Sequence, residues 1–183
     1  ELNIIDVILG TIDIKRVVVD YGKINIKYDN DNNPNFAIFK TNEENKNKLT
    51  LSNLLLFDTH ISFSKKGVNI KWKTQESFFR FTEGNVTINA KLFSEKLIVH
   101  SRDYIHRKKM TLDIALELKK DSILIQKGSI VQIENVKTEL SGKIIQGKII
   151  NLDFACEEQE LINIINNTPE HLKSIYRSFQ ANG

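Results

Sequence analysis

The stretch TLDIALEL, residues 111–118, places a leucine or isoleucine at every second position. Successive side chains of a β-strand point to opposite faces of its sheet, so a period of two predicts a strand with one apolar face. The stretch NVTINAKL, residues 85–92, shows the same alternation. The apolar faces of these two stretches carry Val86, Ile88, Ala90, Leu92, Leu112, Ile114, Leu116 and Leu118.

Short alternating runs of this kind fill residues 1–155. Turn-forming stretches separate them, at 29–35, 42–48, 64–67, 82–85, 119–122 and 141–142. Turns at intervals of roughly 8–15 residues, with no helical pattern between them, favour hairpins and meanders over a parallel sheet. We expect about ten to twelve antiparallel strands. VVVDYGKINI (17–26) and LLLFDTHISF (54–63) also share a pattern at an offset of 37 residues, which suggests a duplicated strand pair.

The pattern changes to a helical one at Cys156, a residue that we expect to be a small core side chain. Leu161, Ile164 and Ile165 are at helical spacing, and Thr168 with Pro169 is typical of a helix start. The next apolar residues recur at i, i+3, i+4 and i+7, and they are Leu172, Ile175, Tyr176 and Phe179. Residues 156–183 therefore predict two short amphipathic helices, or one broken at Pro169, that cap an edge or open end of the sheet.

Composition limits the class of protein. The chain has 183 residues, 26 basic and 23 acidic, and a net charge of +3, which is too balanced to indicate a nucleic-acid binder. Its size suits a single domain over residues 1–183. It begins with Glu rather than Met, and we expect it to be a segment of a longer protein.

Motifs for catalysis or for a cofactor are not found, so we expect a protein that is not an enzyme and has no catalytic residue, metal site or cofactor. The four histidines lack the spacing of a metal site. DNDNNP (29–34) lacks the glycine and the distal glutamate of a calcium loop and is interpreted as a turn.

HSRDYIHRKK (100–109) is the strongest basic cluster. It suits an anionic headgroup or acidic partner, although a solvated hairpin loop is the favoured interpretation.

Residues 140–183, LSGKIIQGKIINLDFACEEQELINIINNTPEHLKSIYRSFQANG, resemble the AsmA-like proteins of the Gram-negative envelope. The similar features are a glycine-containing strand with Gly142, the apolar-Asp-apolar strand NLDF at 151–154, an amphipathic helix, Pro169, a second helix and Gly183. Residues 12–39 resemble the recurring strand pair of that family more loosely. Where that family usually has Leu-Leu before the proline, this chain has Asn167 and Thr168.

The resemblance implies a periplasmic segment of a protein anchored in the inner membrane and linked to outer-membrane biogenesis. It implies a phospholipid or another acyl-chain lipid as ligand, and envelope proteins as partners. A twisted sheet that curls without closing would form an apolar trough. The expected fold is therefore mainly β, a large curved antiparallel sheet forming an open groove or partial barrel, with short C-terminal helices. The eight apolar residues of 85–92 and 111–118 are the candidate lipid-binding residues. The alternative is a structural or adhesive β-sandwich without a ligand.

Overall fold

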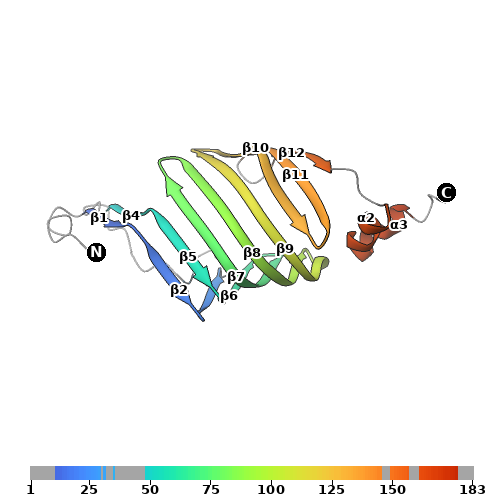
Figure 1. Ribbon diagram of the computed structural model, residues 1–183, viewed down its shortest axis with the longest axis horizontal. Helices are drawn as coiled ribbons and strands as arrows, with labels where there is room; N and C mark the ends of the chain where they lie inside the picture. Colours follow the sequence, from blue (N-terminus) through green and yellow to red (C-terminus); the bar gives the residue numbers. More distant parts are fainter. Residues whose placement is uncertain are drawn as a thin grey trace.

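The computed structural model describes residues 11–29, 31, 35, 48–145, 149–156 and 161–176. They form a ten-stranded mixed sheet that does not close into a barrel, a separate two-stranded pair, and two short helices (Figure 1). The strands are β1 (Thr11–Ile14), β2 (Val17–Asp20), β3 (Lys23–Lys27), β4 (Lys48–Leu51), β5 (Asn53–Phe57), β6 (His60–Lys65), β7 (Val68–Thr82), β8 (Asn85–Val99), β9 (Arg102–Lys119), β10 (Ser122–Ile133), β11 (Val136–Ile145) and β12 (Ile149–Cys156). The helices are α2 (Leu161–Asn167) and α3 (Glu170–Tyr176). The mainly β fold with a curved open sheet is confirmed.

Strands β6 to β12 form an antiparallel meander, because each pairs with the next one along the chain. Two-residue turns join most of them, including Lys66–Gly67, Glu83–Gly84 and Lys120–Asp121, which lie in the predicted turn stretches. The sheet is not wholly antiparallel. Strands β2 and β3 run parallel to β5 and β6, and β1 runs parallel to β4.

The parallel pairings explain the repeat in the sequence. Val17 lies beside Leu54 and Lys23 beside His60, so the register between the two segments is the same 37 residues that separate the similar stretches. Thr11 beside Lys48 extends this register to β1 and β4. The two similar stretches therefore lie next to one another in the sheet, each with the same bend.

That bend forms a crease across the sheet. Tyr21 and Asp58, which follow β2 and β5, both have positive φ, at 49° and 40°. Strand β7 spans the crease unbroken, pairing with β6 before it and with β5 after it, and its register shifts between Thr74 and Glu76. Thr59 and Thr74 meet there and are almost fully buried. The Thr59 amide donates to Thr74 Oγ1 at 3.2 Å, and Thr74 Oγ1 donates to the Thr59 carbonyl at 3.2 Å.

Replacing Thr74 by valine is expected to lower the free energy of unfolding by about 1–3 kcal/mol, because the buried Thr59 amide loses this acceptor. Urea unfolding followed by circular dichroism measures the change. Thr87→Val is the matched control, since Thr87 is an exposed threonine on β8, and its effect should stay within about 0.5 kcal/mol. Equal losses in the two variants would show that the crease does not depend on this hydroxyl.

Three local predictions are wrong. The expected turn at 141–142 lies inside β11, and the chain instead turns at Glu134–Asn135, where Glu134 has φ 52°. Residues 102–109 are not a loop but the first half of β9, and only His100–Ser101 turn, with φ of 47° and 66°. Cys156 is exposed at the end of edge strand β12 rather than in a core. Most of the stretches 29–35 and 42–48 lies outside the described residues.

The helices lie near the C-terminus, as predicted, and break at Pro169. The Thr168 hydroxyl donates to the Ile164 carbonyl at 2.8 Å, so Thr168 closes α2. Helix α3 contacts β9, with the rings of Tyr104 and His171 4.7 Å apart, and α2 contacts β11. The two helices therefore lie beside one end of the sheet (Figure 1). Residues 157–160 and 177–183, including Phe179 and Gly183, lie outside the described residues.

A single curved sheet leaves much of the protein accessible. The buried hydrophobic cluster is small, consisting of Ala90, Leu92 and Met110 on neighbouring strands β8 and β9. Long strands and a large accessible sheet face, rather than a deep hydrophobic core, are therefore the main features of the described structure.

Candidate functional site

The eight predicted lipid-binding residues lie on one face of two neighbouring strands. Residues on β8 and β9 pair directly across the ladder: Val86 with Leu116, Ile88 with Ile114, and Ala90 with Leu112. Leu92 pairs with Met110, which extends the row that sequence reasoning began. Leu118 lies on the same face, opposite Ile123 of β10. The structure thus brings the predicted residues together.

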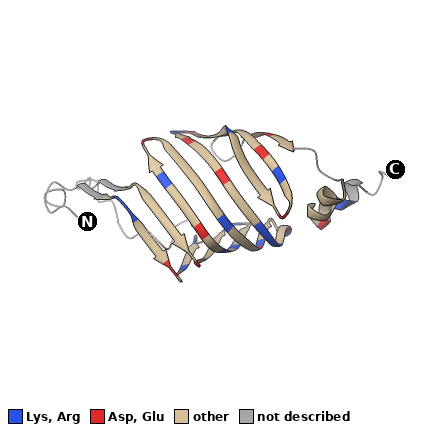
Figure 2. Cartoon of the chain, in the orientation of Figure 1, with Lys and Arg blue, Asp and Glu red and all other residues tan. Residues whose placement is uncertain are grey.

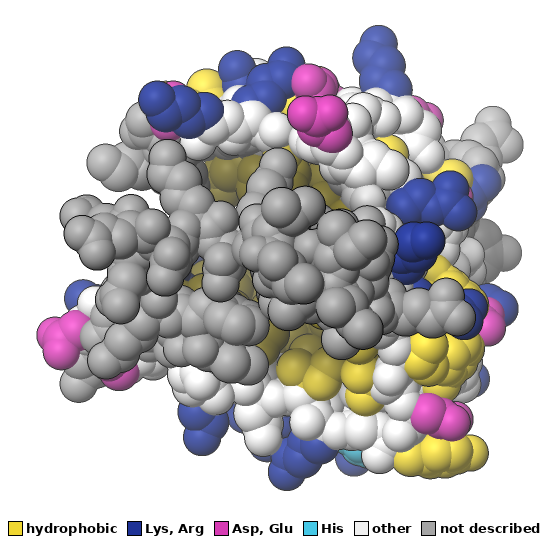
Figure 3. All heavy atoms as spheres, turned by 90° about the vertical axis from the view of Figure 1, so that its left-hand side faces the viewer, with side chains coloured by type: hydrophobic (Ala, Val, Ile, Leu, Met, Phe, Trp, Pro, Cys, Tyr) yellow, Lys and Arg dark blue, Asp and Glu magenta, His cyan; other side chains and the backbone are white. Residues whose placement is uncertain are grey.

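The same face continues across the sheet in apolar rows that cross the strands. Val17, Leu54, Phe79, Ile88 and Ile114 form one such row, in which each residue is in register with the next. Beyond the crease, Ile24, Ile61 and Trp72 form another row. We call this the concave face, because the strands curl around it. Figure 3 looks along the long axis and shows hydrophobic side chains inside the curve and most of the lysine and arginine side chains outside.

Exposure divides the predicted residues into two groups. Val86, Ala90 and Leu92 are buried, at 8%, 6% and 4% exposure; Ala90 and Leu92 lie near the crease, and Val86 lies at the start of β8, beside Phe81. Ile88, Leu112, Ile114 and Leu116 remain partly exposed, and Leu118 is 45% exposed. The first group therefore supports the face, and the second group presents apolar surface to whatever contacts it.

The concave face carries little charge, and its charged residues are basic. Among the described residues, Lys65 and Arg102 lie in its end rung with Val68 and Val99, and Lys108 lies beside Ser94, with its Nζ 3.5 Å from the Asn166 carbonyl of α2. Trp72 and Ser94 are cross-strand neighbours, and within the described part of the chain Trp72 Nε1 and Ser94 Oγ are buried without a hydrogen-bond partner. Buried donors usually have a partner. Two buried polar groups without a partner therefore lie beside the crease.

Several residues of this face were missed by sequence reasoning. Phe79, Leu54, Trp72 and Ile61 belong to it as much as the predicted residues do. The alternation in SFFRFT and HISFS is the signal that could have identified them. Assigning them to one face with residues 86–92 requires the register across three strands, which a single strand pattern does not give.

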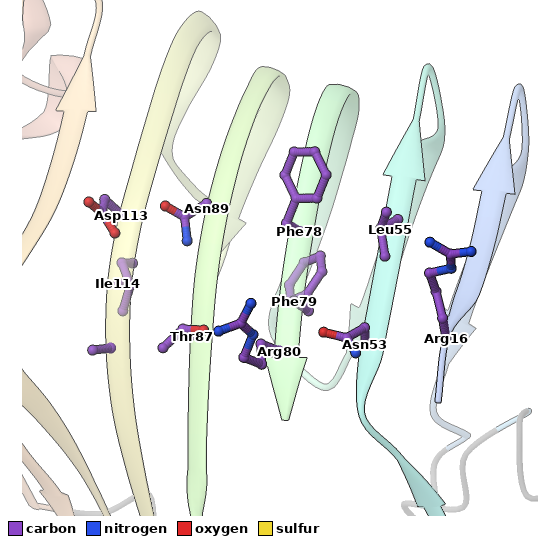
Figure 4. Close-up of a pocket in the computed structure, with 11 residues that line it drawn as sticks. Arg16, Asn53, Leu55, Phe78, Phe79, Arg80, Thr87, Asn89, Asp113 and Ile114 are labelled. Atoms are coloured by element: carbon purple, nitrogen blue, oxygen red, sulfur yellow. The ribbon is translucent and has the colours of Figure 1, made fainter. Parts of the chain in front are cut away.

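A separate cavity of about 540 Å³ lies on the opposite, convex face. Two ladder rungs form its floor: Asn53, Arg80 and Thr87 in one, and Leu55, Phe78, Asn89 and Asp113 in the other (Figure 4). Arg16 joins them from the segment before β2. Both arginine side chains are exposed and the lining mixes polar and apolar residues, so this cavity is a solvated hollow that could hold a small anion only weakly.

Other kinds of site were also sought within the described residues. No three His, Cys, Asp or Glu side chains there are grouped so that they could hold a metal ion. Neither of the described helices has the length and apolar character needed to span a bilayer. Comparisons with family models, with curated proteins and with solved structures found no match to this chain.

Proposed function

We propose that the protein binds the acyl chains of lipids along its concave face and serves as a lipid-binding or lipid-transfer module. The observation that supports this most directly is the continuity of that face. Apolar residues stand in register over successive strands, remain partly exposed, and have no acidic neighbour among the described residues of the face. A surface of this kind offers contact to an apolar chain without requiring a specific polar contact.

The free energy gained by covering an acyl chain is large enough to support binding. Removing each CH₂ of an acyl chain from water is worth about 0.8 kcal/mol, so an acyl chain of typical length represents roughly a dozen kcal/mol. Strands are spaced about 4.8 Å apart, so a row that crosses the eight strand positions of this sheet is roughly 34 Å long. An acyl chain that lies across the strands can therefore stay in contact with apolar side chains while its headgroup remains in solvent.

We also propose the cellular setting that the resemblance to AsmA-like proteins implies. In that setting the chain is a periplasmic segment of a protein anchored in the inner membrane, it carries phospholipid during outer-membrane biogenesis, and envelope proteins are its partners. The support for this setting is the order of features in residues 140–183 together with the open apolar sheet, as in a bridge-type lipid transfer protein. The lipid-binding proposal itself depends on the concave face alone.

Native mass spectrometry tests the proposal directly. The protein is delipidated, exposed to phosphatidylethanolamine or phosphatidylglycerol, and separated from free lipid before measurement. We expect adducts whose added mass equals that of one or more phospholipids. A folded protein that takes up no lipid would contradict the proposal and would favour the alternative, a structural or adhesive domain without a ligand.

A further inference from the structure

The part of the convex face beyond the crease carries a basic array that the lipid-binding trough does not explain. We name it the lysine face and define it by Lys23 and Lys27 of β3, Lys71 and Lys73 of β7, Lys96 of β8 and Lys109 of β9. The ladder register places these residues on the side opposite Trp72 and Ile61. In Figure 2, blue segments gather along the lower part of the sheet, where the strands curl.

Two ladder rungs hold five of the six lysines, and Lys27 lies in a further rung, beside Ser64. One rung contains Lys23, His60, Lys73, Phe93 and Lys109 in order across five strands. The other rung contains Asn25, Ser62, Lys71, Lys96 and His106. At about 4.8 Å between strands, each rung is roughly 19 Å long, so the lysines form a two-dimensional array rather than a line.

The arrangement works against the stability of the sheet. Lys71 and Lys96 are directly opposite each other in the ladder, and like charges in that position are destabilising. None of the six lysine ammonium groups forms an ion pair with another described residue. Three carboxylates lie near the array: Glu95 beside His60, Asp103 beside His106, and Glu134 at the backbone amide of Lys109. Their charges offset the repulsion only in part, because six lysines face three carboxylates, and the face keeps a net positive charge.

We propose that the lysine face docks the protein on an anionic lipid bilayer. Lysine ammonium groups are compact point charges that attract a diffuse anionic surface, and none of the six positions has the bidentate fork of arginine. Juxtamembrane lysines contribute binding to anionic leaflets cumulatively. Half-buried Phe93, between Lys73 and Lys109 in the rung, adds an aromatic ring at the level of the headgroups.

Docking would hold the outside of the curl against the membrane and leave the concave face free to receive an acyl chain. The proposal that docking presents the concave face to lipid rests on the proposed function, whereas the binding of the lysine face to an anionic bilayer does not. A nucleic acid is a less suitable partner, because the overall charge of the chain is only +3 and the array is broad rather than linear.

Co-sedimentation with vesicles tests the inference. We expect the protein to bind vesicles of phosphatidylglycerol mixed with phosphatidylcholine, and not vesicles of phosphatidylcholine alone, with binding that weakens as salt rises. The triple variant Lys71→Gln, Lys73→Gln and Lys96→Gln should bind the anionic vesicles roughly tenfold to hundredfold less tightly. The matched control is Lys120→Gln, Lys127→Gln and Lys143→Gln, which removes the same charge from exposed positions elsewhere and should bind nearly as well as the unaltered protein.

Three outcomes would overturn the inference: equal losses in the two triple variants, equal binding to neutral vesicles, or release from anionic vesicles by a short DNA duplex at equimolar phosphate. Lipid uptake by the concave face is measured on the same variants by native mass spectrometry, and it should be unchanged in both. Vesicle binding without lipid uptake would count against the proposed function and leave the docking surface standing. Lipid uptake without vesicle binding would contradict the docking surface and leave the proposed function standing.

Discussion

Ile88→Asp is expected to abolish the uptake of phospholipid while the protein stays folded. Ile88 lies in the middle of an apolar row, between Phe79 on β7 and Ile114 on β9, and it is partly exposed. A carboxylate there would have to lose its water when an acyl chain covers it, which costs several kcal/mol without a partner. Native mass spectrometry of the delipidated variant should show few or no adducts, and circular dichroism should show an unchanged strand signal.

The control for that variant uses the neighbouring residue of the same strand. Thr87 is exposed on the convex face, so Thr87→Asp adds the same charge one residue away without touching the concave face. Its lipid uptake should equal that of the unaltered protein. Should both variants keep their uptake, lipid would have to bind elsewhere. If Ile88→Asp unfolds the protein, Ile88→Asn supplies a neutral polar side chain at the same place and should reduce uptake by itself.

Alternation along single strands predicted the fold class well, because each strand of this sheet has one apolar face. The pattern of residues 85–92 and 111–118 reports that face directly, and the ladder then places the two stretches side by side. The 37-residue repeat also had a structural meaning, since it is the register of the parallel pairing. Because the two copies of the repeat pair with each other in register, equivalent residues of the copies lie side by side and have similar side chains.

The features that sequence reasoning missed are those that depend on backbone geometry or on more than one strand. The turn at His100–Ser101 has positive φ at both residues without the glycine or asparagine that usually announces such a turn. The crease depends on small buried side chains, Thr59, Thr74 and Ser94, which are not distinctive in a sequence. The lysine face becomes visible only when the register brings β3, β7, β8 and β9 together.

Gly142→Ala is expected to separate β12 from β11 over much of its length. Gly142 has φ 139°, a conformation that residues with a side chain rarely adopt. A Cβ at this position would lie 2.2 Å from the carbonyl oxygen of Asn151 and 2.8 Å from the Cα of Leu152, so backbone on the facing strand would have to move. Since β12 is an edge strand with one partner, it can detach without unfolding the rest of the sheet.

Hydrogen exchange measures that effect locally, as lost protection of amides in residues 149–156, and urea unfolding should show a loss of about 2–4 kcal/mol. Gly128→Ala is the matched control, because Gly128 has φ 82° but no atom within 4 Å of the added Cβ. That variant carries the backbone penalty alone, about 1 kcal/mol, and should leave the exchange of β12 unchanged. The difference between the two variants isolates the steric contact with Asn151. Equal effects would mean that β12 does not approach β11 as closely as described, and the apolar rows would then end at β11.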